Sequence, residues 1–245
     1  MLLNCDLGES YGAWTMGNDI KAMAHIDQVN IACGFHAGDP LVMQNTLHLA
    51  STHGVMIGAH PAYPDLVGFG RRSLNCSTAE IAAMITYQIA ALDGMAQSLG
   101  LQVNYVKPHG ALYNDMMVSD QIRAVIMQTV AAYWRPLRLM LQATPKMHKH
   151  EAEADRYGVR LWREAFADRC YIDDGKLMPR NQAGAVHSHE QMLDQVKQLV
   201  HNSSVTTHTG KVLSLQVDSL CVHGDNDVGI ASIQAIRQCL QQTQG

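Results

Sequence analysis

The stretch VNYVKPHGALYN, residues 103–114, is the clearest guide to the fold of this chain. It begins as a strand-like run that ends at Lys107, where a proline, a histidine, a glycine and two large apolar residues follow. Loops usually carry solvent-facing polar residues, so a lysine and a histidine beside a rigid turn are unexpected there. The stretch therefore predicts a buried strand whose end carries chemically active side chains.

Short apolar runs of this kind alternate with longer segments of helical period along the chain. Asp39 is the expected cap of a helix that begins at Pro40. Ser77, with Glu80 three residues later, has the pattern of a capping box. Strands that alternate with helices predict a parallel sheet, and runs that are apolar throughout predict that both faces are covered. The apolar runs are residues 2–5, 28–33, 55–59, 103–106, 137–141, 159–162, and 212–217 with 219–222.

The number of these strand–helix units favours a closed barrel over an open sheet. No linker, low-complexity tract or internal repeat divides the 245 residues. We therefore expect residues 1–245 to form one domain, an α/β fold in which about seven parallel strands close into a (β/α) barrel. An open, doubly wound sheet is the alternative.

The composition argues against several classes of protein. The formal net charge is −4 and no basic stripe is present, so we expect no nucleic-acid partner. No apolar run reaches membrane-spanning length and no signal-like segment opens the chain, so we expect a soluble protein without membrane contact. The six cysteines form no C-x-x-C pair, and Cys5, Cys33 and Cys221 lie in apolar runs, as small core residues do. A reducing, cytoplasmic compartment is the corresponding expectation.

Charged residues and histidines follow almost every predicted strand. Because ligands bind at the carboxyl ends of strands in parallel α/β folds, we expect these side chains to surround one site. Taken singly, each histidine could be a hydrogen-bonded structural residue, and Asp39 and Asp225 could be helix caps. The residues are Asp6 and Glu9, His36 and Asp39, His60 and Asp65, Lys107 and His109, Glu164, Asp168 and Arg169, and His223 and Asp225.

Carboxylates and imidazoles around one cavity suit two kinds of chemistry. They can act as general acids and bases in a hydrolysis, or they can hold a divalent metal ion that activates water. The motif H-E-x-x-H is absent, so the metal hypothesis rests on residue types alone. Neither a G-x-x-x-x-G-K-[ST] loop nor G-x-G-x-x-G occurs, so the chain shows no common nucleotide site.

The motifs LNCDLGES, NIACGFHAGDP, GAHPAYPDLVGFGRR, VKPHGALYN, EAFADRCY and CVHGDN form a long and specific set. Together they resemble the family of 5-oxoprolinase A subunits, also called the lactam-utilisation or LamB/YcsF family. The resemblance implies a (β/α) barrel related to those of glycoside hydrolases and deacetylases. It also implies a cytoplasmic bacterial protein that works with two partner subunits, B and C, to open 5-oxoproline (pyroglutamate) to L-glutamate while ATP is hydrolysed.

The implied substrate, a five-membered lactam, explains why ATP would be needed. Amide resonance makes the ring carbon a poor target for water, whereas phosphorylation of the lactam oxygen would make that carbon electrophilic. Because this chain lacks a phosphate-binding loop, we expect ATP to act mainly through the partner subunits. The barrel would then receive the activated lactam and add water.

We expect the catalytic residues to be Asp6, Lys107, His109, Glu164 and His223. Asp6 or Glu164 would act as general base on water. His109 or His223 would protonate the leaving ring nitrogen, and Lys107 would stabilise negative charge.

A further set of residues is expected to contact the substrate: His36, His60, Arg71, Arg72, Arg180 and Asp225. One of the arginines would grip the substrate carboxylate, since a guanidinium group can bind a carboxylate through two hydrogen bonds. Arg71 and Arg72 could equally form ion pairs that hold their long loop.

Two other functions fit the same residues. The chain could be a self-sufficient, metal-dependent amide hydrolase or deacetylase that uses His36, His60, His223 and Asp6. A transition metal bound in stoichiometric amount would indicate this function, but the sequence leaves open whether a metal binds. The chain could also be a non-catalytic subunit that only binds pyroglutamate or the partner subunits.

Overall fold

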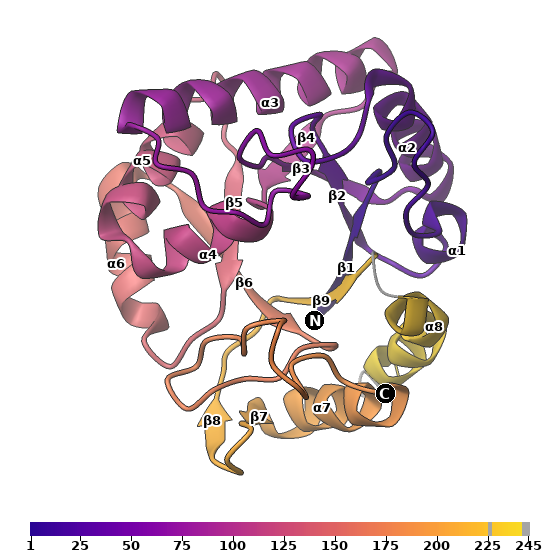
Figure 1. The fold of residues 1–245 in the computed structure, drawn as a ribbon, viewed down its shortest axis with the longest axis vertical. Helices are drawn as coiled ribbons and strands as arrows, with labels where there is room; N and C mark the ends of the chain where they lie inside the picture. The colour runs from indigo at the N-terminus through magenta and orange to yellow at the C-terminus, as the bar shows by residue number, and fades with distance from the viewer. Residues whose placement is uncertain (225–226, 242–245) are drawn as a thin grey trace.

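Seven parallel strands form a closed barrel in the computed structural model, which describes residues 1–224 and 227–241 (Figure 1). The strands are β1 Leu2–Leu7, β2 Gln28–Ala32, β3 Met56–His60, β4 Val103–Val106, β5 Arg138–Gln142, β6 Arg160–Phe166 and β9 Ser219–His223. They follow one another around the barrel in chain order, and β9 closes it by pairing in parallel with both β1 and β6. The predicted barrel of about seven strands is confirmed, and the open sheet is excluded.

Helices surround this barrel and cover its outer face (Figure 1). They are α1 Asp19–Met23, α2 Pro40–His53, α3 Thr78–Ser98, α4 Gly110–Val118, α5 Asp120–Ala131, α6 Met147–Tyr157, α7 His189–Asn202 and α8 Asp227–Gln241. Asp39 caps α2, and Ser77 forms a capping box with Glu80 at the start of α3, as predicted. None of the helices in the described part of the chain has both the length and the apolar composition needed to cross a membrane.

The interior of the barrel holds a network of polar side chains. Asn30 Nδ2 donates to Asn4 Oδ1 at 2.8 Å and to Asp6 Oδ1 at 2.7 Å. The Tyr105 hydroxyl donates to Asn30 Oδ1 at 2.6 Å, which links β4 to β2. The expectation that the strands are apolar throughout is therefore wrong. Side chains alternate along a strand, and these polar residues point inward while their apolar neighbours pack in the hydrophobic core.

One predicted strand lies outside the barrel. Residues 212–217 were expected in the sheet, but β8 (Val212–Ser214) pairs antiparallel with β7 (Ser204–Thr206) in a separate two-stranded sheet. The middle residue of β8 is buried and its two neighbours are exposed. This alternation belongs to a surface hairpin, whereas a barrel strand is covered on both faces.

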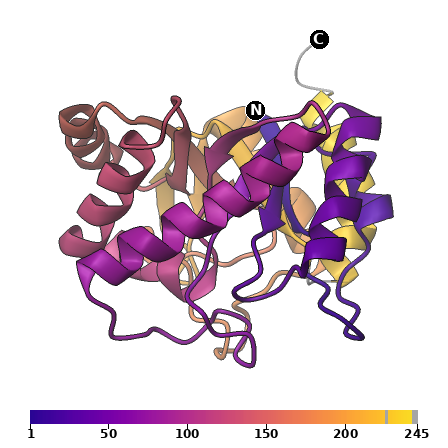
Figure 2. The ribbon, with the colours of Figure 1, turned by 90° about the horizontal axis from the view of Figure 1, so that it is seen from above.

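The long loops lie together at the carboxyl end of the barrel, on the edge opposite the N-terminus in Figure 2. Two of them are residues 61–77, between β3 and α3, and residues 167–188, between β6 and α7. Gln88 of α3 holds the first loop, because its side-chain amide exchanges two hydrogen bonds of 2.9 Å with the backbone of Ala62. The helices thus fix the loops that surround the barrel mouth.

Candidate functional site

A cavity of about 430 Å³ opens at the carboxyl end of the barrel. Residues that follow separate strands meet there, as the sequence predicts. The predicted residues that line it are Asp6, His60, Arg71, Lys107, His109, Arg180 and His223, together with Phe166 and Arg169. Another concavity, of about 400 Å³, lies at the amino ends of β5 and β6, and two of its six charged residues, Arg163 and Asp218, pair with each other. The chemically active groups therefore gather in the first cavity.

Lys107 lies between two carboxylates in this cavity. Its Nζ is 2.8 Å from Asp6 Oδ1, 2.8 Å from Glu164 Oε1 and 3.2 Å from Cys221 Sγ. Burial lowers the pKa of the ammonium group, but the Asp6 carboxylate and the other two neighbours raise that pKa well above its ordinary value. Lys107 is therefore a fixed cation, which can stabilise negative charge on a ligand but cannot act as a base.

Asp6 is a weak base because of the same contacts. Burial raises the pKa of its carboxyl group, but the Lys107 ammonium, with His60 and His223 nearby, holds that pKa well below its ordinary value. Cys221, by contrast, stays a thiol, because burial raises its pKa well above the ordinary value. Asp6 is thus better suited to hold Lys107 than to remove a proton from water.

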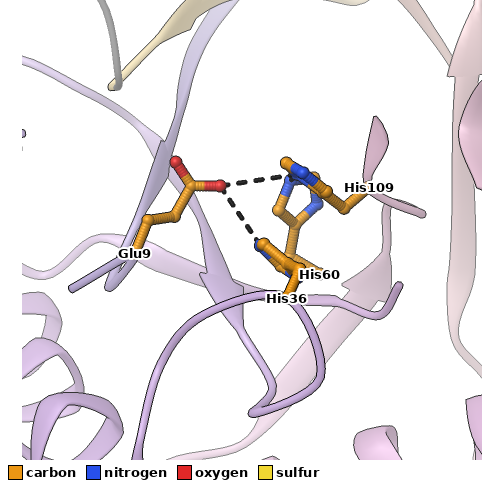
Figure 3. Close-up of side chains that lie close together, drawn as sticks. All are labelled: Glu9, His36, His60 and His109. Carbon is orange, nitrogen blue, oxygen red and sulfur yellow. Dashed lines mark hydrogen bonds and ion pairs between the residues drawn. The ribbon is translucent and has the colours of Figure 1, made fainter. Parts of the chain in front are cut away.

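Three histidines and a glutamate form a buried cluster beside this group (Figure 3). His36 and His109 stack with their ring centroids 3.7 Å apart and their planes 6° apart, and His60 lies nearly perpendicular to both. Glu9 Oε1 is 3.2 Å from His36 Nε2 and 3.4 Å from His109 Nδ1. Burial, with the neighbouring histidines, lowers the pKa of His36 and of His109 well below the ordinary value. Both rings are therefore neutral at neutral pH.

The loop after β3 packs closely against this cluster. The Phe69 carbonyl accepts a hydrogen bond of 2.9 Å from His109 Nε2. Phe69 has a φ of 53°, in the left-handed region that residues other than glycine rarely adopt. At Gly70, whose φ is 63°, a Cβ would lie 2.8 Å from His36 Cβ and 2.9 Å from His109 Cδ2. The glycine is required for the loop to approach the stacked rings this closely.

His223 and Asp168 form a hydrogen-bonded dyad at the cavity. His223 Nδ1 lies 2.9 Å from Asp168 Oδ2, and the His223 ring stacks on Phe166 with a centroid distance of 5.4 Å. Burial raises the pKa of the Asp168 carboxyl, but His223, with Arg180 and Arg169, lowers it to about 2. An ionised carboxylate on Nδ1 fixes the tautomer of the ring and directs Nε2 to proton transfer with a ligand.

Three arginines, Arg71, Arg169 and Arg180, give the cavity a positively charged wall. Arg169 is anchored to the second long loop, where its Nη2 donates to the Met178 carbonyl at 2.6 Å and its Nε to the Ala185 carbonyl at 3.3 Å. Burial lowers the pKa of the Arg169 guanidinium to about 10, and repulsion from Arg180 contributes. A bound anion relieves this repulsion, so the wall suits a carboxylate or a phosphate.

The structure places Arg72, which was predicted to contact substrate, in an ion pair within the loop. Its Nε lies 3.0 Å from both carboxylate oxygens of Asp65. The Arg72 side chain is 64% exposed, and Arg72 is not among the described residues that line the cavity. The structural alternative that the sequence left open for this arginine is the one observed, whereas Arg71 lies at the cavity.

Residues 8–12, GESYG, match the G-x-S-x-G pattern of serine hydrolases but do not share its geometry. Ser10 Oγ accepts a hydrogen bond of 3.0 Å from the backbone nitrogen of Met16, and Tyr11 pairs with Trp14 across a turn. A nucleophile elbow instead joins a strand directly to a helix. Glu9, not Ser10, is the residue of this stretch that reaches the histidine cluster.

Two predicted site residues need separate mention. Glu164 is fully buried, where it contacts Lys107 and accepts a hydrogen bond of 2.8 Å from the Tyr113 hydroxyl. Asp225, predicted to bind substrate, lies outside the described residues.

The four metal ligands predicted for a self-sufficient hydrolase do not form one group. His36 and His60 belong to a possible metal-binding group with Glu9 and His109, whereas Asp6 and His223 belong to another with Cys221. The two groups adjoin each other, because Asp6 at the end of β1 is followed closely by Glu9 and His60 Nε2 lies 3.4 Å from Asp6 Oδ2.

Four residues at the site received no catalytic or binding role from the sequence, namely Glu9, Asp168, Arg169 and Cys221. Glu9, Asp168 and Arg169 stand after predicted strands, but only the folded loops decide which of these side chains turn inward. Cys221 was expected to be a core residue, yet it contacts Lys107. Its spacing of two from His223 places both on one face of β9, and this was the available signal.

The chain matches the LamB/YcsF family along residues 1–245. A protein of Pseudomonas fluorescens that is named as the A subunit of 5-oxoprolinase is 53% identical over 244 residues, which are 99% of this chain and 97% of that protein. Its namesake from Chromohalobacter salexigens is 50% identical and covers 96% of this chain and 95% of its own length. The similarity therefore spans the barrel and all of its loops.

A solved structure has the same fold. The crystal structure of the lactam utilization protein from Thermus thermophilus superimposes with a TM-score of 0.90 at 36% sequence identity. The match covers 100% of this chain and 97% of the other. The barrel is thus retained although most of the residues differ.

Proposed function

Because the chain belongs to the LamB/YcsF family, we propose that it is the A subunit of an ATP-dependent 5-oxoprolinase, which opens 5-oxoproline to L-glutamate. The observation that carries this proposal is the nearly complete match, at 53% and 50% identity, to proteins named as A subunits of 5-oxoprolinase. The word subunit implies an assembly. We therefore propose that the chain acts in the cytoplasm with partner subunits B and C, and that ATP acts through those partners.

The cavity has the chemistry that this substrate needs. 5-Oxoproline is a small lactam that carries one carboxylate. The wall formed by Arg71, Arg169 and Arg180 supplies guanidinium groups for that carboxylate, or for a phosphoryl group on the activated ring. The buried Lys107 ammonium and the His223 ring lie at the same cavity, where they can reach the ring amide.

Activation by ATP overcomes the low reactivity of the ring amide. Phosphoryl transfer to the lactam oxygen makes the ring carbon electrophilic. Water adds to that carbon, the bond from carbon to ring nitrogen breaks, and the nitrogen takes up a proton, which leaves a glutamyl phosphate. A second water displaces phosphate and releases L-glutamate. Residues of this chain are required in the water-addition and proton-transfer steps.

We assign the stabilisation of negative charge to Lys107, which Asp6 and Glu164 hold in place. Proton transfer falls to His223, because Asp168 fixes its Nδ1 and leaves Nε2 to exchange a proton with water or the ring nitrogen. His109 is less suitable, since its Nε2 already donates to a backbone carbonyl. Of the two proposed acid groups, His223 is therefore the better candidate.

Replacing Lys107 tests the proposed function. In the enzyme reconstituted with subunits B and C, Lys107→Met should lower turnover at least about 100-fold, because a preorganised charge is lost from the site. Turnover is measured as L-glutamate formed and ATP hydrolysed. Lys149→Met, at an exposed position of α6, is the matched control and should leave turnover unchanged. Full activity of Lys107→Met would remove this lysine from the mechanism.

The same assay separates the competing functions. Glutamate released from 5-oxoproline by the chain alone, with Zn²⁺ but without ATP or partners, would indicate a self-sufficient hydrolase. Coupled turnover that survives both Asp168→Asn and His223→Asn would indicate a subunit that only binds. The proposed function requires turnover that depends on the partners, on ATP and on these side chains together.

A further inference from the structure

We propose that Glu9, His60 and His109 form a binding site for one divalent first-row transition metal ion, with Zn²⁺ the best match to the donor set. The inference rests on side-chain geometry and does not depend on the proposed function. The ligand atoms of these three residues and of His36 lie within 4.8 Å of one another in a buried cluster (Figure 3). Two imidazole nitrogens and a glutamate oxygen, with a fourth position open, form a donor set of catalytic zinc sites.

The hydrogen bonds of His60 and His109 leave two lone pairs that face each other. His60 Nδ1 lies 2.6 Å from the Lys107 carbonyl, and His109 Nε2 lies 2.9 Å from the Phe69 carbonyl. A carbonyl only accepts, so both of these nitrogens carry hydrogen. His60 Nε2 and His109 Nδ1 then present lone pairs to each other at 2.9 Å. His60 Nε2 also lies 3.4 Å from Asp6 Oδ2. The two facing lone pairs repel each other unless a proton or a metal ion lies between them, and binding of an added metal ion distinguishes these two cases.

The separations of the donor atoms agree with tetrahedral coordination. Bonds of about 2.0–2.1 Å to Zn²⁺ place neighbouring donors about 3.3 Å apart. His60 Nε2 and His109 Nδ1 are 2.9 Å apart, and His109 Nδ1 and Glu9 Oε1 are 3.4 Å apart. Each of these two separations differs from the ideal edge by a few tenths of an ångström, and the third, between His60 and Glu9, is at most 4.8 Å.

The surroundings of both histidines are those of metal ligands. A metal-bound histidine ordinarily donates its other ring N–H to a carbonyl or carboxylate, which fixes the orientation of the ring. His60 and His109 both do this. The carbonyl that accepts from His109 belongs to Phe69, whose left-handed φ of 53° is the kind of backbone strain that persists at functional sites. His60 and His109 also line the cavity, which gives an ion a route to the site.

His36 has a different part in the cluster. Its ring is parallel to that of His109, with centroids 3.7 Å apart. A ring lone pair lies in the plane of the ring, so two stacked rings cannot both point at one ion. His36 Nε2 instead contacts Glu9 Oε1 at 3.2 Å. We therefore assign His36 to holding Glu9, and not to the ion.

The second possible group, Asp6 with Cys221 and His223, is a poorer cation site. The Lys107 ammonium lies 2.8 Å from Asp6 Oδ1 and 3.2 Å from Cys221 Sγ. It already supplies the positive charge there and would repel a metal ion. A substitution in this second group, Cys221→Ser, therefore serves as a control for metal binding at the first.

The test is metal binding by the purified full chain after treatment with a chelator, with Zn²⁺ as the probe. Equilibrium dialysis followed by elemental analysis should give one ion per chain. His60→Ala and His109→Ala should each weaken binding at least about 100-fold, because even the loss of a group that orients a ligand costs about 10–100-fold. Cys221→Ser and His48→Ala, the latter exposed on α2, should bind as the unmodified chain does.

A spectroscopic measurement on the unmodified chain covers the case in which the variants do not fold. Bound Co²⁺ should give the intense visible absorption of a four- or five-coordinate site, unlike the weak absorption of the hydrated ion. Circular dichroism reports whether each variant is folded. The proposal is overturned if the folded chain shows no saturable binding of Zn²⁺ or Co²⁺. It is also overturned if both histidine variants bind normally, or if only Cys221→Ser loses the ion.

Discussion

Single residues at the site are held by charges that have been removed from water. Lys107 is 2% exposed and Glu164 is fully buried, so their ion pair exists without solvent. Burying charges is costly, and breaking such a pair is more damaging than replacing both partners by apolar groups. The Asp168–His223 pair follows the same rule. Function and stability are therefore coupled at these residues.

Lys107→Met should reduce the free energy of unfolding by about 3–5 kcal/mol, because it leaves buried carboxylates without their cation. Denaturant unfolding followed by circular dichroism measures this loss. Adding Glu164→Gln should restore part of the stability, since one uncompensated charge is removed. The exposed control Lys149→Met should stay within about 0.5 kcal/mol of the unmodified chain. Equal free energies of unfolding for Lys107→Met and Lys149→Met would contradict a stabilising role of the buried ion pair.

Asp168 should make the protein sensitive to acid. Its carboxyl pKa is about 2 in the folded chain and 3.8 when unperturbed, so its stabilising effect is present above about pH 4 and is lost as the pH falls toward 2. Between about pH 6 and about pH 3 this loss is about 1 kcal/mol. Unfolding by urea at the two pH values measures it. Asp168→Asn should lose less stability over this range, and an identical loss in both proteins would refute the assignment.

At the scale of elements, the turns after the strands decide the geometry of the site. The loop between β3 and α3 carries Phe69 and Gly70 with positive φ, and it brings one backbone carbonyl to His109. Gln88 of α3 ties the beginning of that loop to the helix. A strand end alone would leave the imidazole free to rotate, so the loop supplies the orientation.

Gly70→Ala should lower stability and turnover more than Gly54→Ala does, although both glycines have a left-handed backbone. A Cβ there overlaps His36 and His109, whereas a Cβ at Gly54, with φ of 65°, meets no atom of the described chain within 4 Å. Both substitutions cost about 1–2 kcal/mol for the left-handed backbone. Gly70→Ala should lose further stability in thermal unfolding and reduce coupled turnover, while Gly54→Ala keeps its turnover. Equal behaviour of the two variants would show that the loop does not press on the histidines.

At the scale of the whole molecule, the barrel joins its strands through a polar interior. The network of Asn4, Asn30, Tyr105 and Ser219 connects β1, β2, β4 and β9, and Asp6 belongs to it as well. Closure of the barrel excludes water from these groups, so each must find a partner inside. The barrel interior thus forms a hydrogen-bonded base for Lys107 and the carboxylates.

Tyr105→Phe should lower the free energy of unfolding by about 1–2 kcal/mol, because the buried Asn30 Oδ1 loses its donor. Tyr87→Phe on α3, at a position that is 62% exposed, is the matched control and should change stability by less than about 0.5 kcal/mol. Urea unfolding compares the two. A neutral effect of Tyr105→Phe would mean that the interior network adds nothing to stability.

The local pattern of the sequence was enough to predict the barrel and the end at which the site lies. Apolar runs, the Asp39 cap and the Ser77 capping box depend only on residues a few positions apart in the chain. They can therefore be recognised in the sequence before the fold is known. The surface hairpin of residues 204–214 was missed, because a short apolar run does not reveal whether it is buried on one face or on both.

The sequence by itself determined which side chains follow each strand, and hence that acids, histidines and arginines meet at one end of the barrel. Only the tertiary structure decided their partners: Lys107 with Asp6 and Glu164, and His223 with Asp168. It also placed Arg72 on Asp65 and away from the cavity. The reason is physical, since a contact between residues far apart in the chain depends on strand register, loop backbone angles and the exclusion of water. These are properties of the closed barrel and not of any local stretch.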